Sequence, residues 1–409
     1  MKKSILLLLC CAMAPLLMAQ PVVKRVVTIE VTNPYQQSQR DAPVVLNLRS
    51  LKLHFDVRCA VVASLTQEIP SQLDDLDGDG VADELVWVMD LPAQGLERLT
   101  VTLSSETSAK SYPARTFAQM LIRDGKKNKH AQAESLTVPG KSNVYNLIYG
   151  HGPMMESELV GYRIYFNQKQ TIDPYGKFKQ RLELESCSFY PTDEQLAAGY
   201  GDDVLMVGNS CGIGALKGWD GNKATHIEPI ASRTERVVTY GPVRAILEVA
   251  VKGWNYQNSL MDMTQRYILY AGHRDLQIDC SFGEPLQEQT FVTGVQRIMG
   301  TETVMESDHE GLVGSWGRHW PVTDTVKYAK ETIGIATYVP QRYVRQEVSD
   351  PDNYLYLLSA PKSNYFTYYT MFTSRKEEFG YPDAPSWFAY MGEWKEQLQH
   401  PLEVKLIKK

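Results

Sequence analysis

The stretch from Tyr149 to Lys177 concentrates side chains that can do chemistry. Its residues, YGHGPMMESELVGYRIYFNQKQTIDPYGK, include a histidine, two glutamates, an arginine, four tyrosines, an aspartate and two lysines. β-Elimination of a uronic acid needs three of these types. A cation neutralises the carboxylate, a base takes the C5 proton, and an acid protonates the leaving oxygen. The stretch therefore predicts a reactive surface for acidic sugars.

Two further loops offer the same residue types. YAGHRDL holds His273 and Arg274 between two strong strand patterns, and SWGRHWP surrounds Arg318 with aromatic rings. For elimination, His151 or His273 would be the base, Tyr165 or Tyr175 the acid, and Arg163 or Arg318 the cation. The expected substrate contacts are Glu158, Arg163, Asp173, Lys177, Trp219, Arg274, Trp316, Arg318, His319 and Trp320.

Two other functions fit the same residues. A glycoside hydrolase uses two carboxylates roughly 5 to 10 Å apart, and Glu156 or Glu158 with Asp173 would supply them. A non-catalytic carbohydrate-binding protein needs only aromatic faces, such as those of Trp219 and Trp316. An enzyme is favoured if His151, Arg163, Tyr165 and a histidine or arginine of a second loop converge in one concave pocket. A binding protein is favoured if the cleft shows only stacked tryptophans on a shallow face.

Alternation along a strand decides which side chains of the central motif share a face. In GYRIYFN, Tyr162 and Ile164 fall on one face, which is apolar enough to be core. Arg163 and Tyr165 fall on the other, where a guanidinium beside a phenol suits an anionic sugar. Turns at both strand ends expose the rest of the motif, and loops at strand ends commonly carry function.

An acidic loop, DDLDGDGVADE, has the spacing of a calcium loop. Asp75, Asp77, Asp79 and Asp83 occupy positions one, three, five and nine, but Val86 stands where the twelfth position needs a bidentate acid. The loop is therefore not an EF-hand. A structural calcium ion and a plain Asp/Gly hairpin turn both fit it, and no other cofactor is expected.

The strand patterns predict an all-β protein. A small N-terminal β-sandwich over residues 20–111 precedes a large β-supersandwich over residues 112–409. QRLELESCSF reads as one of the strands. Only PTDEQLAAGY and APSWFAYMGEWKEQLQ have helical patterns.

Composition narrows the partners and the compartment. The net charge is −6 and no basic tract stands out, so we expect no nucleic-acid partner. Residues 1–19 have the charged start, apolar run and small-residue end of a secretory signal, which predicts a periplasmic or secreted protein without a transmembrane segment. Four cysteines remain after its removal, and their spacing leaves disulfides and free thiols equally open.

The sequence resembles a bacterial family known as domain of unknown function 4861. HGPMMESELVGYRIYF with TIDPYGK, YAGHRDL, GSWGRHWP and the Trp-rich C-terminus carry the resemblance, and it extends over nearly the whole mature chain. YAGHRDL is also similar to the β-supersandwich of galactose-mutarotase-like proteins and several polysaccharide lyases. The resemblance implies that fold and a carbohydrate ligand, and it assigns no catalytic residue.

Overall fold

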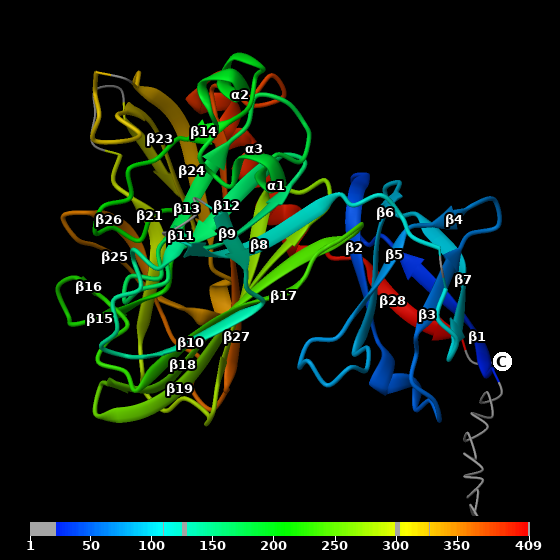
Figure 1. Ribbon diagram of the computed structural model, residues 1–409. Coiled ribbons are helices and arrows are strands. Elements are labelled where there is room, and N and C mark those ends of the chain that lie inside the picture. The colour runs from blue at the N-terminus through cyan, green and yellow to red at the C-terminus, as the bar shows by residue number, and fades with distance from the viewer. Residues whose placement is uncertain (1–21, 109, 125–128, 299–302, 327, 408–409) are drawn as a thin grey trace, which may run out of the picture.

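The computed structural model describes residues 22–108, 110–124, 129–298, 303–326 and 328–407. The chain is all-β and forms two units, a small one at the N-terminus and a large one built around three sheets (Figure 1). The predicted secretory signal lies outside the described residues. Within them, no helix is both long and apolar enough to cross a membrane. The thiols of Cys59, Cys187, Cys211 and Cys280 are free.

The small unit packs two sheets face to face. Its five-stranded sheet has the order β28-β1-β7-β3-β4, and its three-stranded sheet has the order β2-β6-β5. The five-stranded sheet comprises β1 (Lys24–Thr32), β3 (Cys59–Ala63), β4 (Glu68–Ile69), β7 (Leu96–Ser104) and β28 (Glu403–Ile407). The other comprises β2 (Gln39–Asn47), β5 (Ser71–Asp74) and β6 (Glu84–Leu91), with a 3-10 turn at Leu48–Leu51. Alternating apolar residues such as Ile29, Leu99 and Trp87 fill the core between the sheets.

The last strand of the chain belongs to the small unit, although the expected boundary assigned residues 112–409 to the large one. β28 pairs antiparallel with β1, from Thr28 opposite Ile407 to Thr32 opposite Glu403. In Figure 1 this red strand lies among the blue strands of the N-terminus. Pairing covers an edge of β1 that would otherwise expose free backbone groups.

The large unit places a nine-stranded sheet against a six-stranded and a five-stranded sheet, and their inner faces share one core. In order across the nine-stranded sheet, the strands are β10 (Ser135–Pro139), β17 (Ser232–Thr239), β18 (Arg244–Tyr256), β19 (Ser259–Tyr270), β20 (Asp275–Phe282), β27 (Tyr365–Ser374), β24 (Glu331–Tyr338), β23 (Leu312–His319) and β22 (Val304–Ser307). The five-stranded sheet contains β16 (Ala224–Thr225), β15 (Lys217–Trp219), β21 (Phe291–Gln296), β26 (Asn353–Leu358) and β25 (Val344–Ser349), with a 3-10 turn at Gln341–Tyr343.

The six-stranded sheet carries the central motif. Its order is β14 (Asp202–Asp203), β13 (Ile172–Gly176), β12 (Val160–Ile164), β11 (Ile148–Ser157), β8 (Thr116–Asp124) and β9 (Lys129–Gln132). As predicted, Tyr162 and Ile164 point into the main core. The opposite face of β12 is covered rather than exposed to solvent. The segment after β13 folds back over this face and packs Leu184 and Phe189 there.

Among the described residues, three α-helices complete the large unit. Each of the two segments with a helical pattern contains a helix. α2 (Asp193–Ala197) begins with a capping box at Thr192, and α3 (Ala384–Gln399) is capped by Asp383. The expected strand QRLELESCSF is wrong, because this segment forms the short helix α1 (Leu184–Cys187). Its apolar residues alternate as in a strand, but Glu183 N–H and Leu184 N–H donate to the buried carboxylate of Glu156, which fixes a turn.

Candidate functional site

Arg163 is the centre of the candidate site. It lies on β12 opposite Asp173 of β13, and its side chain is nearly fully buried. Its guanidinium ion-pairs with Asp173, and Nη2 lies 3.3 Å from Oδ2 of Asp203 on the edge strand β14. Nη2 also donates to the Tyr165 hydroxyl at 3.0 Å, and Nη1 donates to the Tyr190 hydroxyl at 2.7 Å. One buried cation therefore positions two carboxyl groups and two phenols.

The two carboxyl groups have different environments. Asp173 is 1% exposed, and its Oδ1 has no hydrogen-bond partner within the described residues. The Asp203 side chain keeps 14% of its surface exposed. Burial and the negative charge of Asp173 raise the pKa of Asp203 well above its ordinary value, which favours the protonated carboxyl. Burial also raises the pKa of Tyr165, which donates its hydroxyl to Asp173 at 3.0 Å.

His151 is held on the same surface by an irregular stretch of β11. The β11–β8 register shifts between Tyr149 and Met154, and Gly150 and His151 both have positive φ, at 74° and 67°. The imidazole stacks on Tyr145, with ring centroids 3.7 Å apart, and its Nδ1 lies 3.0 Å from the Tyr145 carbonyl oxygen. A carbonyl only accepts, so Nδ1 carries the proton of the neutral ring and Nε2 keeps its lone pair.

Charge and burial keep His151 neutral. Burial lowers its pKa, and the positive charges of Arg163 and Arg123 lower it further. Its ring centroid lies 6.3 Å from that of Tyr165. Within the described residues, Nε2 of this imidazole has no hydrogen-bond partner. The ring lies beside Tyr165, whose hydroxyl accepts from the same guanidinium that contacts Asp203.

Aromatic rings extend this surface towards an unpaired cation. Tyr190 meets Tyr149 edge-on at 5.6 Å, and the Arg123 guanidinium lies 5.2 Å from the centre of the Tyr149 ring. Arg123 is exposed and forms no ion pair within the part of the chain that the structure describes. Tyr145 and Tyr190 are 48% and 39% exposed, which leaves ring faces open to a sugar.

The motif brings together His151, Arg163, Tyr165 and Asp173, as the sequence predicted. It also brings in residues that sequence reasoning missed: Arg123, Tyr145, Tyr149, Tyr190 and Asp203. Only GDDV, an acidic pair after a glycine, marks Asp203 in the sequence. Strand pairing beside Tyr175 brings this pair to the site.

Tyr175 and Lys177 are structural, because neither side chain reaches the surface. The Tyr175 hydroxyl donates to Glu183 at 3.0 Å. Lys177 Nζ donates to Glu156 at 2.5 Å, to the Ser157 carbonyl at 2.6 Å and to the Arg181 carbonyl at 2.7 Å. A fully buried lysine needs these partners. This pair also occupies Glu156, which sequence reasoning had considered as a hydrolytic carboxylate.

The second predicted loop lies elsewhere, where the two units meet. His273 bridges Asp275 and the Asp41 carbonyl, each at 3.0 Å, and its backbone carbonyl accepts from Ser157. Arg274 is buried against Glu377 at 3.0 Å. Glu158 pairs with Arg115 and accepts from the Gly272 N–H. These residues do not converge with His151.

The remaining predicted contacts are spread over the large unit. Trp316 is buried in the core beneath α3. His319 is buried on the same strand, and Arg318 is exposed there. Trp320 is half-buried, with Lys330 5.6 Å from its ring centre. Trp219 is half-buried on β15, and its backbone N–H donates to the Tyr256 hydroxyl at 2.7 Å.

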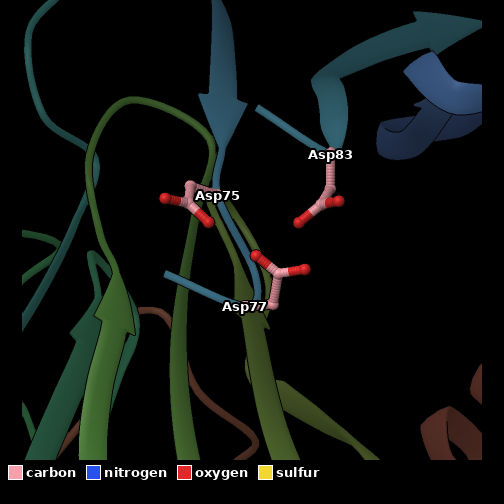
Figure 2. Close-up of side chains that lie close together, drawn as sticks. All are labelled: Asp75, Asp77 and Asp83. Carbon is pink, nitrogen blue, oxygen red and sulfur yellow. The ribbon is translucent and has the colours of Figure 1, made fainter. Parts of the chain in front are cut away.

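The acidic loop joins β5 to β6 and brings three carboxylates together. One oxygen each from Asp75, Asp77 and Asp83 lies within 4.8 Å of the others, whereas Asp79 is not in the group. Figure 2 shows the three side chains on their loop. Arg49 lies 3.0 Å from Asp77 and 2.7 Å from Asp83, so the protein supplies a cation of its own. The donor set fits calcium in type, and the ion stays a prediction.

The sequence of the chain matches one known protein family. Residues 31–404 match the family described as Domain of unknown function (DUF4861). The chain belongs to this family. No curated protein matches it.

Solved structures with a similar course of the chain include two from Enterococcus. One is an α-mannosidase from Enterococcus faecalis V583, with 10% identity and a TM-score of 0.45; the match covers 94% of this chain and 46% of that protein. The other is a glycosyl hydrolase family 38 protein from Enterococcus faecalis, with 12% identity and a TM-score of 0.44; it covers 94% and 47%. The chain thus spans about half the length of each.

Proposed function

We propose that this protein is an exported carbohydrate-active enzyme that cleaves uronic-acid glycans by β-elimination at the Arg163 surface. The observation that carries the proposal is that His151, Asp203 and Arg123 border one aromatic surface, and that Arg123 forms no ion pair within the described residues. The lowered pKa of His151 favours its neutral ring, and the raised pKa of Asp203 favours its protonated carboxyl. These three residues are the base, the acid and the carboxylate-binding cation that the reaction needs. His151 belongs to the Tyr149–Lys177 motif, whereas Arg123 and Asp203 lie outside it.

Each group has one role. Arg123 binds the uronate carboxylate, which makes the C5 proton more acidic. His151 Nε2 takes this proton. The C4–O bond breaks, its electron pair stays on the leaving oxygen, and Asp203 protonates that oxygen as a double bond forms between C4 and C5. Tyr165 and Tyr190 stack against the sugar or donate to its hydroxyls.

The geometry moves the cation role from Arg163 to Arg123. The ion pair with Asp173 already neutralises Arg163, so Arg163 has no spare charge for a substrate carboxylate. Arg163 is instead a positioning residue that holds Tyr165 and Asp203. Arg123, in contrast, is exposed and has no carboxylate partner within the described residues; its Nε donates to the Ile148 carbonyl at 3.5 Å, and its guanidinium lies over the Tyr149 ring.

Hydrolysis is the second candidate, because Asp173 and Asp203 form a pair of carboxyl groups around one guanidinium. A hydrolytic nucleophile or base must contact the sugar or a water beside it. Asp173 is 1% exposed, which argues against this role. Elimination is therefore the better-supported reaction.

Product analysis in isotopically labelled water tests the proposal. The mature protein is incubated with oligomers of galacturonate, glucuronate and mannuronate, and the masses of the products are measured by mass spectrometry. Elimination adds no water, so we expect unlabelled products whose masses sum to that of the substrate. Labelled products would move the function to hydrolysis. Retained but uncleaved oligosaccharide would make this a carbohydrate-binding protein.

A further inference from the structure

A second hollow lies between the two units, apart from the Arg163 surface. Its volume is about 600 Å³, and it is bounded by β2 of the small unit, the β19–β20 turn, β27 and the helix α3. In Figure 1, α3 runs behind the large unit towards the small one. Pockets of this size at domain junctions are common ligand sites.

The hollow and the Arg163 surface lie on opposite faces of β12. Arg163 points to the face covered by α1 and Phe189. Tyr162, its neighbour in the chain, points the other way and donates its hydroxyl to the carbonyl of Arg274, which lines the hollow. Since neighbouring residues of a strand face opposite sides, one ligand does not fill both places.

Ion pairs between the units fix the walls of the hollow. Arg115 of the large unit bonds Asp41 of the small one at 2.7 Å, and Arg244 bonds Asp74 at 2.7 Å and Glu84 at 2.6 Å. Arg244 and Asp74 are buried, so these contacts resist screening by salt. The hollow is therefore preformed and does not depend on closure of the two units.

One wall is aromatic and carries polar groups at its edge. Tyr369 of β27 and Tyr390 of α3 are half-buried, and Trp394 lies one turn further along α3. Gln397 follows on the same side of the helix. Across from them, Arg40 of β2 is exposed and forms no ion pair within the described ranges.

The opposite wall resists an added peptide strand. β2 is an edge strand, which is where extended peptides pair. However, its register with β6 shifts between Gln39 and Ala42, and Asp41 has a φ of 46°. Pro43 lacks an N–H to donate. Ring faces next to amide and guanidinium donors instead match a sugar, whose C–H faces stack while its hydroxyls accept and donate.

We propose that this interdomain hollow is a second carbohydrate site, which holds an oligosaccharide between Arg40 and the Tyr369–Tyr390 wall. The inference rests on the walls of the hollow and not on the proposed reaction. A longer glycan held here is retained by the protein independently of cleavage at His151.

Calorimetric titration of the His151→Ala protein tests the second site, because this variant binds without turnover. The probes are an oligogalacturonide and a cello-oligosaccharide. We expect two binding sites per chain for the oligogalacturonide. Adding Arg40→Gln and Tyr369→Ala should remove one of them or weaken it about tenfold or more, since a lost hydrogen bond to a charged group is worth about 1.5–3 kcal/mol. Adding Arg123→Gln should weaken the other.

Arg342→Gln is the matched control, because Arg342 also lies over a tyrosine ring, that of Tyr343 at 4.6 Å, but outside the hollow. It should change nothing, and melting temperatures check that each variant is folded. Binding that survives Arg40→Gln with Tyr369→Ala, or no binding by either probe, overturns the second site. If only Arg123→Gln has no effect, the proposed reaction surface fails and the hollow stands.

Discussion

His151 owes its chemical state to its neighbours rather than to its residue type. The Tyr145 carbonyl selects the tautomer, and burial with two nearby guanidinium groups favours the neutral ring. The sequence shows a histidine in a turn, but it does not show which nitrogen is free. Asp203 is a similar case, because only strand pairing brings its carboxyl to Arg163.

The pH profile of cleavage follows from these two groups. His151 acts when neutral, and its pKa lies below the ordinary value of about 6.5. Activity should therefore fall as the pH drops through a pKa that lies below 6.5. Asp203 acts when protonated, and because its pKa is raised, activity should fall as the pH rises through that value. Initial rates across pH measure both limbs, and an acid limb centred above pH 6.5 would contradict the role of His151.

A substrate whose leaving group needs no proton separates the acid from the base. Asp203→Asn should lose most of the rate on a natural glycan, by about 10²- to 10⁴-fold, which is typical of general acid catalysis. With a nitrophenolate leaving group at C4 it should recover, whereas His151→Ala should not. If both variants respond alike to the leaving group, Asp203 is not the proton donor.

Arg163 can be tested through stability, because its removal leaves a buried carboxylate without a counter-charge. Arg163→Met should destabilise the fold by about 3–5 kcal/mol, the usual effect of breaking a buried ion pair. Denaturant unfolding measures this. Arg318→Met removes an exposed arginine of the same size from another strand and should have little effect. Equal losses in the two variants would show that the Arg163 network adds no stability.

The elements show why local patterns predicted the strand but not its surroundings. Alternation correctly assigned Tyr162 and Ile164 to the core, because period two is a local property. The cover over Arg163 depends on QRLELESCSF, whose helix forms through a contact with Glu156 some 27 residues earlier in the chain. A contact of this range leaves no mark in the local pattern.

Gly152 sets the irregular path of β11 that presents His151. A Cβ at this position would lie 1.7 Å from the Ile164 carbonyl oxygen, so Gly152→Ala should displace β11 from β12 and lower both stability and cleavage. Gly392→Ala is the control, since nothing lies within 4 Å of a Cβ there and alanine favours its helix by about 1 kcal/mol. Melting curves and initial rates compare them, and an unchanged Gly152→Ala protein would refute the close approach.

At the scale of the molecule, the sequence predicted two β units, but it did not predict that the last strand of the chain pairs with the first. β28 returns about 300 residues after β7 to complete the first sheet, and its only partner in the described chain is β1. Its five-residue pattern is that of any exposed edge strand, so no local signal assigns it to a sheet.

Removing residues 403–409 should expose β1 selectively. The amides of Thr28–Thr32 that face β28 lose their partners, while those facing β7 remain paired. Hydrogen exchange should therefore speed up in β1 and stay slow in β12 of the large unit. Unchanged protection of β1 would show that β28 does not stabilise the small unit.

The most direct test of the central claim is the ultraviolet absorbance of the unsaturated product during incubation with uronic-acid oligosaccharides. The account predicts that absorbance rises with the unaltered protein and with His309→Ala, which changes an exposed histidine paired with Glu347 in another region. It predicts no rise with His151→Ala. Absorbance that never rises with the unaltered protein, or that survives His151→Ala, would contradict elimination at the Arg163 surface.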